Sequence, residues 1–202
     1  MNIVKHPNRG WIEVICGPMF SGKSEELIRR LRRARIARQD VLAFKPRLDN
    51  RYSENAIASH NQQIIPCVLI DSADEIFVHL RPQTQVVGID EVQFLGAAAP
   101  RICREMAARG VRIICAGLDT DYRARPWPPV PEFLADAEYI TKTLAICVVC
   151  GDPANRTQRK VHSGELVLIG SADSYEARCR HCHTVDGVIQ PSMFGDEAGG
   201  NP

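Results

Sequence analysis

Residues 15–27 read ICGPMFSGKSEEL, in which an apolar run breaks into a glycine-bounded loop and then into a helix-like segment. The phosphate-binding P-loop pattern, which ends in Gly-Lys-Ser, is matched by Gly17, Pro18, Met19, Phe20, Ser21, Gly22, Lys23 and Ser24. Backbone N–H groups of such a loop converge on phosphate oxygens at a helix N-terminus, where the helix dipole also favours an anion. We expect Lys23 to reach the β- and γ-phosphates and Ser24 to coordinate Mg²⁺. The stretch therefore predicts a site for a nucleoside triphosphate.

Short apolar segments rich in β-branched residues alternate with helical segments around this loop. Strands are predicted at 11–16, 41–44, 86–90, 111–117 and 137–141, and helices at about 22–38, 72–80 and 97–109. The alternation predicts an α/β fold whose parallel sheet is covered by helices on both faces. The first helix is crowded with arginines, and its polar face either is solvated or contacts another subunit or an acidic ligand.

Composition argues for a protein that acts through specific sites. The 202 residues carry 25 basic and 24 acidic side chains, a formal net charge of +1, which gives no bulk attraction to nucleic acid or to a membrane surface. No stretch reaches the roughly 20 apolar residues needed to span a bilayer, and the N-terminus lacks the apolar segment of a secretion signal. We therefore expect a cytoplasmic protein.

Two regions depart from the alternating pattern. Residues 45–61 form a polar connection too long for an ordinary loop, so it is either functional or disordered. Residues from about 144 to 190 contain two cysteine pairs and look like a separate small subdomain. We predict a P-loop domain at 1–142, a metal-binding subdomain at 143–192 and a flexible tail at 193–202.

Two acids follow the predicted strand at 86–90. Asp90 ends that strand and Glu91 comes directly after it, so both are expected at the carboxyl edge of the sheet, where ligands bind. Asp90 is the natural carboxylate for holding the Mg²⁺ shell. Glu91 suits a general base toward an attacking hydroxyl, or a group that orients water in an ATPase. The residues alone leave both chemistries open.

The cysteine spacing predicts a structural metal site. Cys147 and Cys150 form one Cys-x-x-Cys pair, and Cys179 and Cys182 form another. Four thiolates favour a tetrahedral zinc ion with no open position for chemistry. His183 in place of Cys182 is an alternative fourth ligand, and a pair of disulfides is an alternative in an oxidising compartment. The other cysteines, Cys16, Cys67, Cys103 and Cys115, are expected to be small core residues.

Five segments together carry a resemblance to type II thymidine kinases. They are GPMFSGKS at 17–24, DEVQF at 90–94, AGLDTDYRARPW at 116–127, the paired CVVC and CRHC, and GSADSYEARCR at 170–180. Over about residues 11–190 the chain is similar to this family. The resemblance implies a RecA-like P-loop NTPase fold with a zinc-containing lasso, and transfer of the γ-phosphoryl group of ATP to the 5′-hydroxyl of thymidine. It also implies a homotetramer and feedback inhibition by thymidine triphosphate.

The resemblance also implies residue roles. Glu91 matches the family's general base, and Lys23, Ser24 and Asp90 match its phosphate and Mg²⁺ positions. The residues expected to line the nucleoside are Met19, Leu118, Tyr122, Phe133, Thr157 and Tyr175. Tyr122 and Phe133 would be aromatic walls and Tyr175 would close over the ligand, although without the resemblance Leu118 and Phe133 read as core residues.

Some positions differ from the family or extend it. Asp49 and Arg51, with His60 after them, resemble a segment that lies near the phosphates and moves. Ser171 stands where many members have glycine, and Tyr122 stands where they often have phenylalanine, which adds a hydroxyl that needs a partner. Two other classes compete: a P-loop ATPase that remodels or repairs DNA, and a zinc-ribbon nucleic-acid binder. The near-neutral charge disfavours both.

Overall fold

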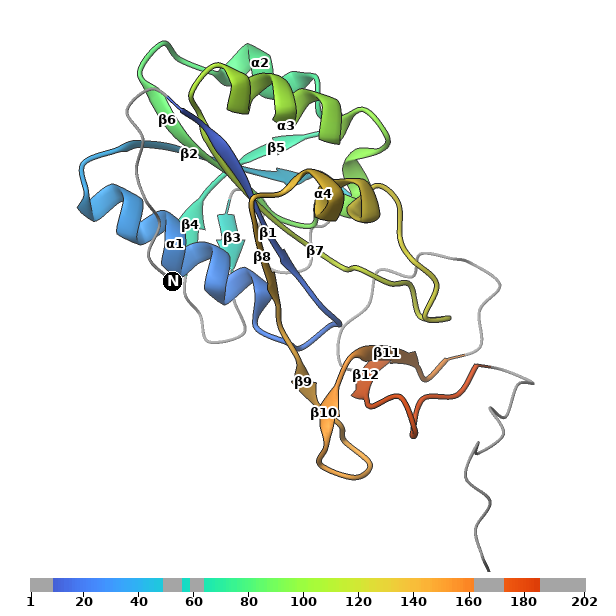
Figure 1. Cartoon of the computed structure of the whole chain (residues 1–202). Coiled ribbons are helices and arrows are strands. Elements are labelled where there is room, and N and C mark those ends of the chain that lie inside the picture. Colours follow the sequence, from blue (N-terminus) through green and yellow to red (C-terminus); the bar gives the residue numbers. More distant parts are fainter. Residues whose placement is uncertain (1–8, 49–55, 59–63, 162–172, 186–202) are drawn as a thin grey trace, which may run out of the picture.

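A parallel six-stranded sheet forms the centre of the computed structural model, which describes residues 9–48, 56–58, 64–161 and 173–185. The strand order is β5-β2-β6-β7-β1-β8, and every neighbouring pair is parallel (Figure 1). The strands are β1 (Trp11–Cys16), β2 (Asp40–Pro46), β5 (Val68–Ile70), β6 (Thr84–Ile89), β7 (Arg112–Gly117) and β8 (Tyr139–Lys142). Expectations for Asp49, Arg51, His60, Ser171 and the tail at 193–202 fall outside the described residues.

Helices cover both faces of the sheet. On one face α1 (Lys23–Ile36) buries Leu27, Ile28 and Leu31 against the strands. The opposite face is covered by α2 (Glu75–His79), the short 3₁₀ helix η1 (Val92–Leu95), α3 (Ala99–Ala108) and α4 (Val130–Asp136). Because side chains alternate across a strand, the apolar run of β1 supplies both cores, with Val14 in one and Ile15 in the other.

Six short strands, paired two by two, complete the described chain. The pair β3 (Ala56–Ala58) and β4 (Ile64–Pro66) is antiparallel and packs near α1. Beyond β8 the chain forms the pairs β9 (Ala145–Ile146) with β10 (Pro153–Ala154), and β11 (Arg156–Arg159) with β12 (Tyr175–Arg178), below the main sheet in Figure 1.

The structure confirms the predicted α/β fold. All five predicted strands are present, and the three predicted helices are present but shorter than expected. The sequence patterns missed β5 and α4, because the first has only three residues and the second directly follows the proline-rich segment 126–129. Among the described residues, no helix combines the length and hydrophobicity needed to cross a membrane.

The cysteines outside the two pairs behave mostly as core residues. Cys16, Cys103 and Cys115 are buried, whereas Cys67 is only half-buried and packs at the edge of the α1 core. None of the eight cysteines, all of which lie in the described part of the chain, forms a disulfide, so the structure does not contain the alternative of two disulfides.

A buried carboxylate joins three elements of the fold. Glu13 in β1 is 1% exposed and accepts hydrogen bonds from Arg112 Nε at 2.6 Å, Arg30 Nη1 at 2.7 Å and Trp11 Nε1 at 2.8 Å. Burial favours the neutral acid, but the arginine contacts prevail and lower the pKa of Glu13. Since Arg30 lies in α1 and Arg112 in β7, this cluster fixes the helix and both strands together.

We predict that Glu13→Ala lowers the free energy of unfolding by about 3–5 kcal/mol, because two largely buried arginines lose their carboxylate. Urea unfolding at neutral pH measures this. The matched control is Glu105→Ala, which breaks an exposed ion pair with Arg109 and should cost about 0–1 kcal/mol. Equal losses in the two variants would contradict a special role for the Glu13 cluster.

The same cluster predicts a pH dependence. The folded pKa of Glu13 lies below its ordinary value of 4.5, so its contribution is complete above that pH and is lost as pH falls through the folded pKa. The stability difference between wild type and Glu13→Ala should therefore shrink in acid.

Candidate active site

The P-loop connects the end of β1 to the start of α1 and packs against the chain that follows β8. Gly17 has φ 145° and Gly22 has φ 80°, values that glycine adopts without strain. A Cβ on Gly17 would lie 2.3 Å from the carbonyl oxygen of Thr143. Thr143 N donates to Cys16 O at 2.8 Å, and its hydroxyl lies 2.8 Å from Ser21 Oγ. The loop is therefore held tightly on this side.

The first turn of α1 carries the groups expected to meet phosphate. Gly22 is the N-cap residue of α1. Because glycine has no side chain, the N–H groups of the first helical turn receive no side-chain hydrogen bond from it. Lys23 is buried, and its Nζ donates to Pro18 O at 2.7 Å, which places the ammonium group across the loop. Ser24, half-buried, is the second residue of the helix. A cation, a hydroxyl and a helix N-terminus thus occur together.

Asp90 and Glu91 lie where β6 ends at the carboxyl edge of the sheet. Asp90 is 5% exposed, and its backbone N–H donates to Phe44 O of the neighbouring strand at 3.0 Å. Its Oδ1 accepts the N–H of Glu91 at 3.1 Å. Glu91 is half-buried and has φ 49°, a left-handed conformation that is uncommon for a residue with a side chain. Two consecutive carboxylates therefore lie at a backbone turn of unusual conformation.

Gln93 links this turn to the next strand, and the sequence analysis did not identify it. Its side chain is 4% exposed. Nε2 donates to Glu91 Oε2 at 2.6 Å, and Oε1 accepts the backbone N–H of Leu118 at 3.1 Å. Gly117 makes room for this amide, since a Cβ there would lie 2.7 Å from Gln93 Oε1. The amide orients Glu91 relative to the end of β7.

The structure connects several of the expected nucleoside residues. The backbone N–H of Met19, in the P-loop, donates to Thr157 Oγ1 of β11 at 3.0 Å, so the loop contacts the small subdomain directly. Leu118 is joined to Glu91 through Gln93. Tyr122 and Tyr175, from a loop and from β12, both contact Arg159.

Phe133 does not lie with these residues. It belongs to α4, is fully buried, and packs in the main core between the sheet and the helices. This agrees with the core interpretation that the residue types alone suggested, and we leave it out of the site proposed below. The sequence analysis did not identify one aromatic contact near Glu91 in the chain. Phe94 packs edge-on against Trp127 with ring centroids 5.6 Å apart.

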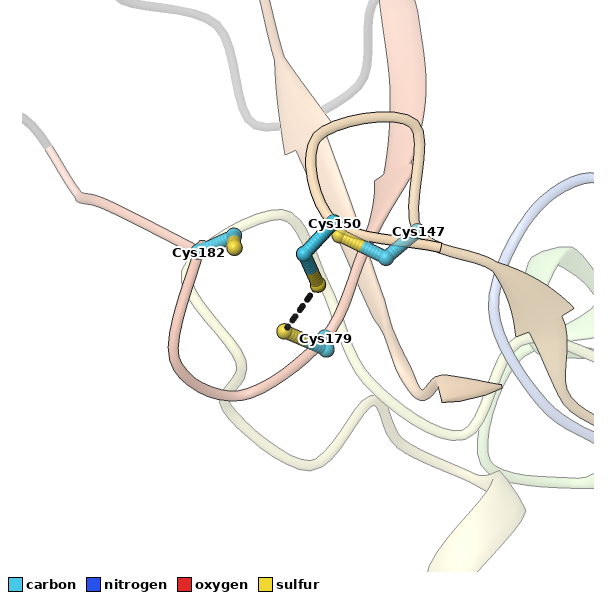
Figure 2. A group of neighbouring side chains, drawn as sticks. All are labelled: Cys147, Cys150, Cys179 and Cys182. Carbon is cyan, nitrogen blue, oxygen red and sulfur yellow. Dashed lines mark hydrogen bonds between the residues drawn. The ribbon is translucent and has the colours of Figure 1, made fainter. Parts of the chain in front are cut away.

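The two cysteine pairs meet at one point, as Figure 2 shows. The four sulfur atoms lie within 4.8 Å of one another, and Cys150 Sγ is 3.6 Å from Cys179 Sγ. Burial opposes ionisation of Cys147, but backbone hydrogen bonds from Cys179, Cys150 and Val149 lower its pKa to about 6. A set of four soft ligands with a stabilised thiolate is compatible with zinc.

His183 is engaged elsewhere, which bears on the choice of the fourth ligand. Its Nε2 lies 2.9 Å from Tyr122 O and must donate, because a carbonyl oxygen only accepts. Burial lowers the pKa of His183, which favours the neutral ring that this contact uses. Among the described residues, Cys182 and not His183 completes the sulfur cluster.

Comparisons with known proteins agree with these features. A family model described as thymidine kinase matches residues 10–183. The thymidine kinase of Rhodothermus sp. (strain ITI 518) is 54% identical over 173 residues, which are 86% of this chain and 81% of that protein. Among solved structures, the flagellar accessory protein FlaH of Methanocaldococcus jannaschii aligns over 85% of this chain and 88% of its own, with a TM-score of 0.47 and 13% identity, a likeness too distant to support an argument.

The phosphate-binding loop, the paired acids and the four-cysteine cluster all fall within the matched residues. Because more than half of the aligned positions are identical to a thymidine kinase, and the alignment covers most of both chains, this chain belongs to the thymidine kinase family.

Proposed function

We propose that the chain transfers the γ-phosphoryl group of ATP to the 5′-hydroxyl of thymidine, with Glu91 as the general base. The observation that carries the proposal is the arrangement of Glu91, held by the turn after Asp90 and by the amide of Gln93. A carboxylate that is fixed but still half-exposed suits proton abstraction from a bound alcohol.

The reaction has simple requirements of these residues. The 5′-oxygen forms a bond to the γ-phosphorus while the bond from that phosphorus to the bridging oxygen of ADP breaks, and the hydroxyl proton passes to Glu91. Lys23 and the N–H groups at the start of α1 would hold the phosphate charge. The hard oxygen donors of Ser24 and Asp90 fit Mg²⁺, which would offset charge on the β- and γ-phosphates.

We propose that the nucleoside lies between the P-loop, the loop after β7 and the β11–β12 pair. Met19 and Thr157 are already joined there by a hydrogen bond, and Leu118, Tyr122 and Tyr175 come from the same three segments. The aromatic pair Phe94 and Trp127 extends this list, because Phe94 follows Gln93 directly. The division of the chain after residue 142 belongs to the same proposal.

The resemblance to type II enzymes supports further proposals about the whole molecule. We propose a cytoplasmic homotetramer that thymidine triphosphate inhibits by occupying the acceptor site and the phosphate loop together. Sedimentation of the active enzyme should give a tetramer, and a stable, fully active monomer would contradict this assembly. Titration of thymidine triphosphate against both substrates should show competition with each.

Replacing Glu91 by glutamine tests the proposed base. Glu91→Gln should keep ATP and thymidine affinity while kcat falls by about 10²–10⁴-fold, since the amide cannot take a proton. ADP release is measured with thymidine, with other nucleosides, with DNA and without an acceptor. Glu105→Gln, on the exposed face of α3, is the matched control and should behave as wild type.

Gln93→Met extends this test to the contact that orients Glu91. It removes both amide hydrogen bonds at similar volume, so kcat should fall by about tenfold while ATP affinity is kept.

Near-normal turnover by Glu91→Gln would refute the assignment of the base. ADP release by the wild type that needs no acceptor, or that DNA stimulates, would point to an ATPase instead.

We propose a structural zinc ion at the cysteine cluster, and predict about one zinc per chain by elemental analysis. Cys147→Ser should weaken thymidine binding before it lowers the melting temperature of the sheet, because the cluster closes the small subdomain and not the main core. Cys67→Ser, a half-buried cysteine outside the cluster, is the control and should keep zinc and affinity. Freshly purified protein without zinc would contradict the proposal.

A further inference from the structure

Arg159 occupies an unusual position between two tyrosines. It is 8% exposed and stands directly opposite Tyr175 in the register of β11 with β12. Its guanidinium carbon lies 3.8 Å from the ring centroid of Tyr122 and 5.4 Å from that of Tyr175. Nη2 donates to Tyr175 Oη at 2.9 Å. One buried cation therefore contacts both aromatic residues.

We infer that Arg159 is a positioning residue that fixes Tyr122 and Tyr175 as a single unit beside the nucleoside. This inference rests on the proposed function for the location of the nucleoside. In this role Arg159 affects the affinity for thymidine through the two tyrosines, and it does not affect the affinity for ATP.

The direction of the hydrogen bond follows from the chemistry of the groups. A guanidinium has donors only, so Tyr175 Oη accepts from Arg159. The hydroxyl hydrogen can then be given only to a different acceptor. Acceptance from a cation also polarises the hydroxyl and makes it a stronger donor. The contact therefore fixes the position of the Tyr175 hydroxyl and strengthens a hydrogen bond that it donates.

The cation–π contact with Tyr122 carries the second half of the inference. A guanidinium at 3.8 Å over an aromatic ring is a close cation–π contact, and in a buried setting it is stronger than in water. Tyr122 is also held at its hydroxyl by Arg123 Nε at 2.8 Å and at its carbonyl by His183. Arg159 thus joins the loop after β7 to the small subdomain through the face of Tyr122.

The strand itself provides a matched control. Burial alternates along β11, with Thr157 and Arg159 buried and Arg156 and Gln158 half-buried on the opposite side. Arg156 has the same side chain on the same strand, and its described hydrogen bond is a long one to the adjacent Asn155 O. Arg156→Met removes the same charge without touching either tyrosine.

The test measures thymidine affinity by calorimetry and both KM values in the ADP-release assay, with melting temperature and zinc content for each variant. Arg159→Met should raise the Kd and KM for thymidine by about tenfold and leave the KM for ATP within about twofold. Arg159→Lys, which still donates but cannot stack, should fall between wild type and Arg159→Met. Arg156→Met should match wild type.

A double-mutant cycle with Tyr175→Phe completes the experiment. If Arg159 acts through the hydroxyl of Tyr175, the combined loss of thymidine affinity should be clearly smaller than the product of the two single losses. Full multiplication of the losses, unchanged thymidine affinity in Arg159→Met, or an equal rise in the KM for ATP would each overturn the inference. The proposed function fails separately, by absence of thymidine-dependent ADP release in the wild type.

Discussion

The close approach of the P-loop to the segment that leaves β8 is the constraint on which the site depends. Gly17 lies so near the carbonyl oxygen of Thr143 that no side chain fits between them, and Thr143 also contacts Cys16 and Ser21. From Thr143 the chain leaves β8 and continues toward the cysteine cluster. On the other side Met19 is bonded to Thr157. The phosphate loop is therefore held between the sheet and the small subdomain, so a distortion of either part would displace the loop.

The buried and half-buried acids of the chain illustrate two uses of a carboxylate. Glu13 is surrounded by arginines, which lower its pKa and make it an internal link between helix and strands. Asp90 accepts the backbone N–H of Glu91, and Glu91 accepts a hydrogen bond from the amide of Gln93, so these contacts help to orient the two acids at the end of β6.

Contiguous patterns in the sequence predicted most of the fold, and residues that act across strands were missed. The P-loop and each of the cysteine pairs can be recognised in the sequence because the residues of the motif are close together along the chain. Gln93 and Arg159 were not identified, because their partners Leu118, Tyr122 and Tyr175 become neighbours only after the strands pair. Phe133 was expected near the nucleoside only because of the family resemblance, whereas its residue type alone indicated the core position that it has in α4. The choice between Cys182 and His183 also needed the structure, since the two are adjacent.

The cysteine cluster and the tyrosine contacts are parts of one arrangement. The two cysteine pairs flank β11 and β12, so closing the cluster restrains the register that places Arg159 opposite Tyr175. His183 immediately follows Cys182 and bonds to Tyr122 O, which gives the cluster a second, shorter connection to the loop after β7. Neither connection passes through the two main cores. A metal ion bound by the four cysteines would therefore restrain β11, β12 and, through His183, the loop after β7, without taking part in the packing of the main sheet.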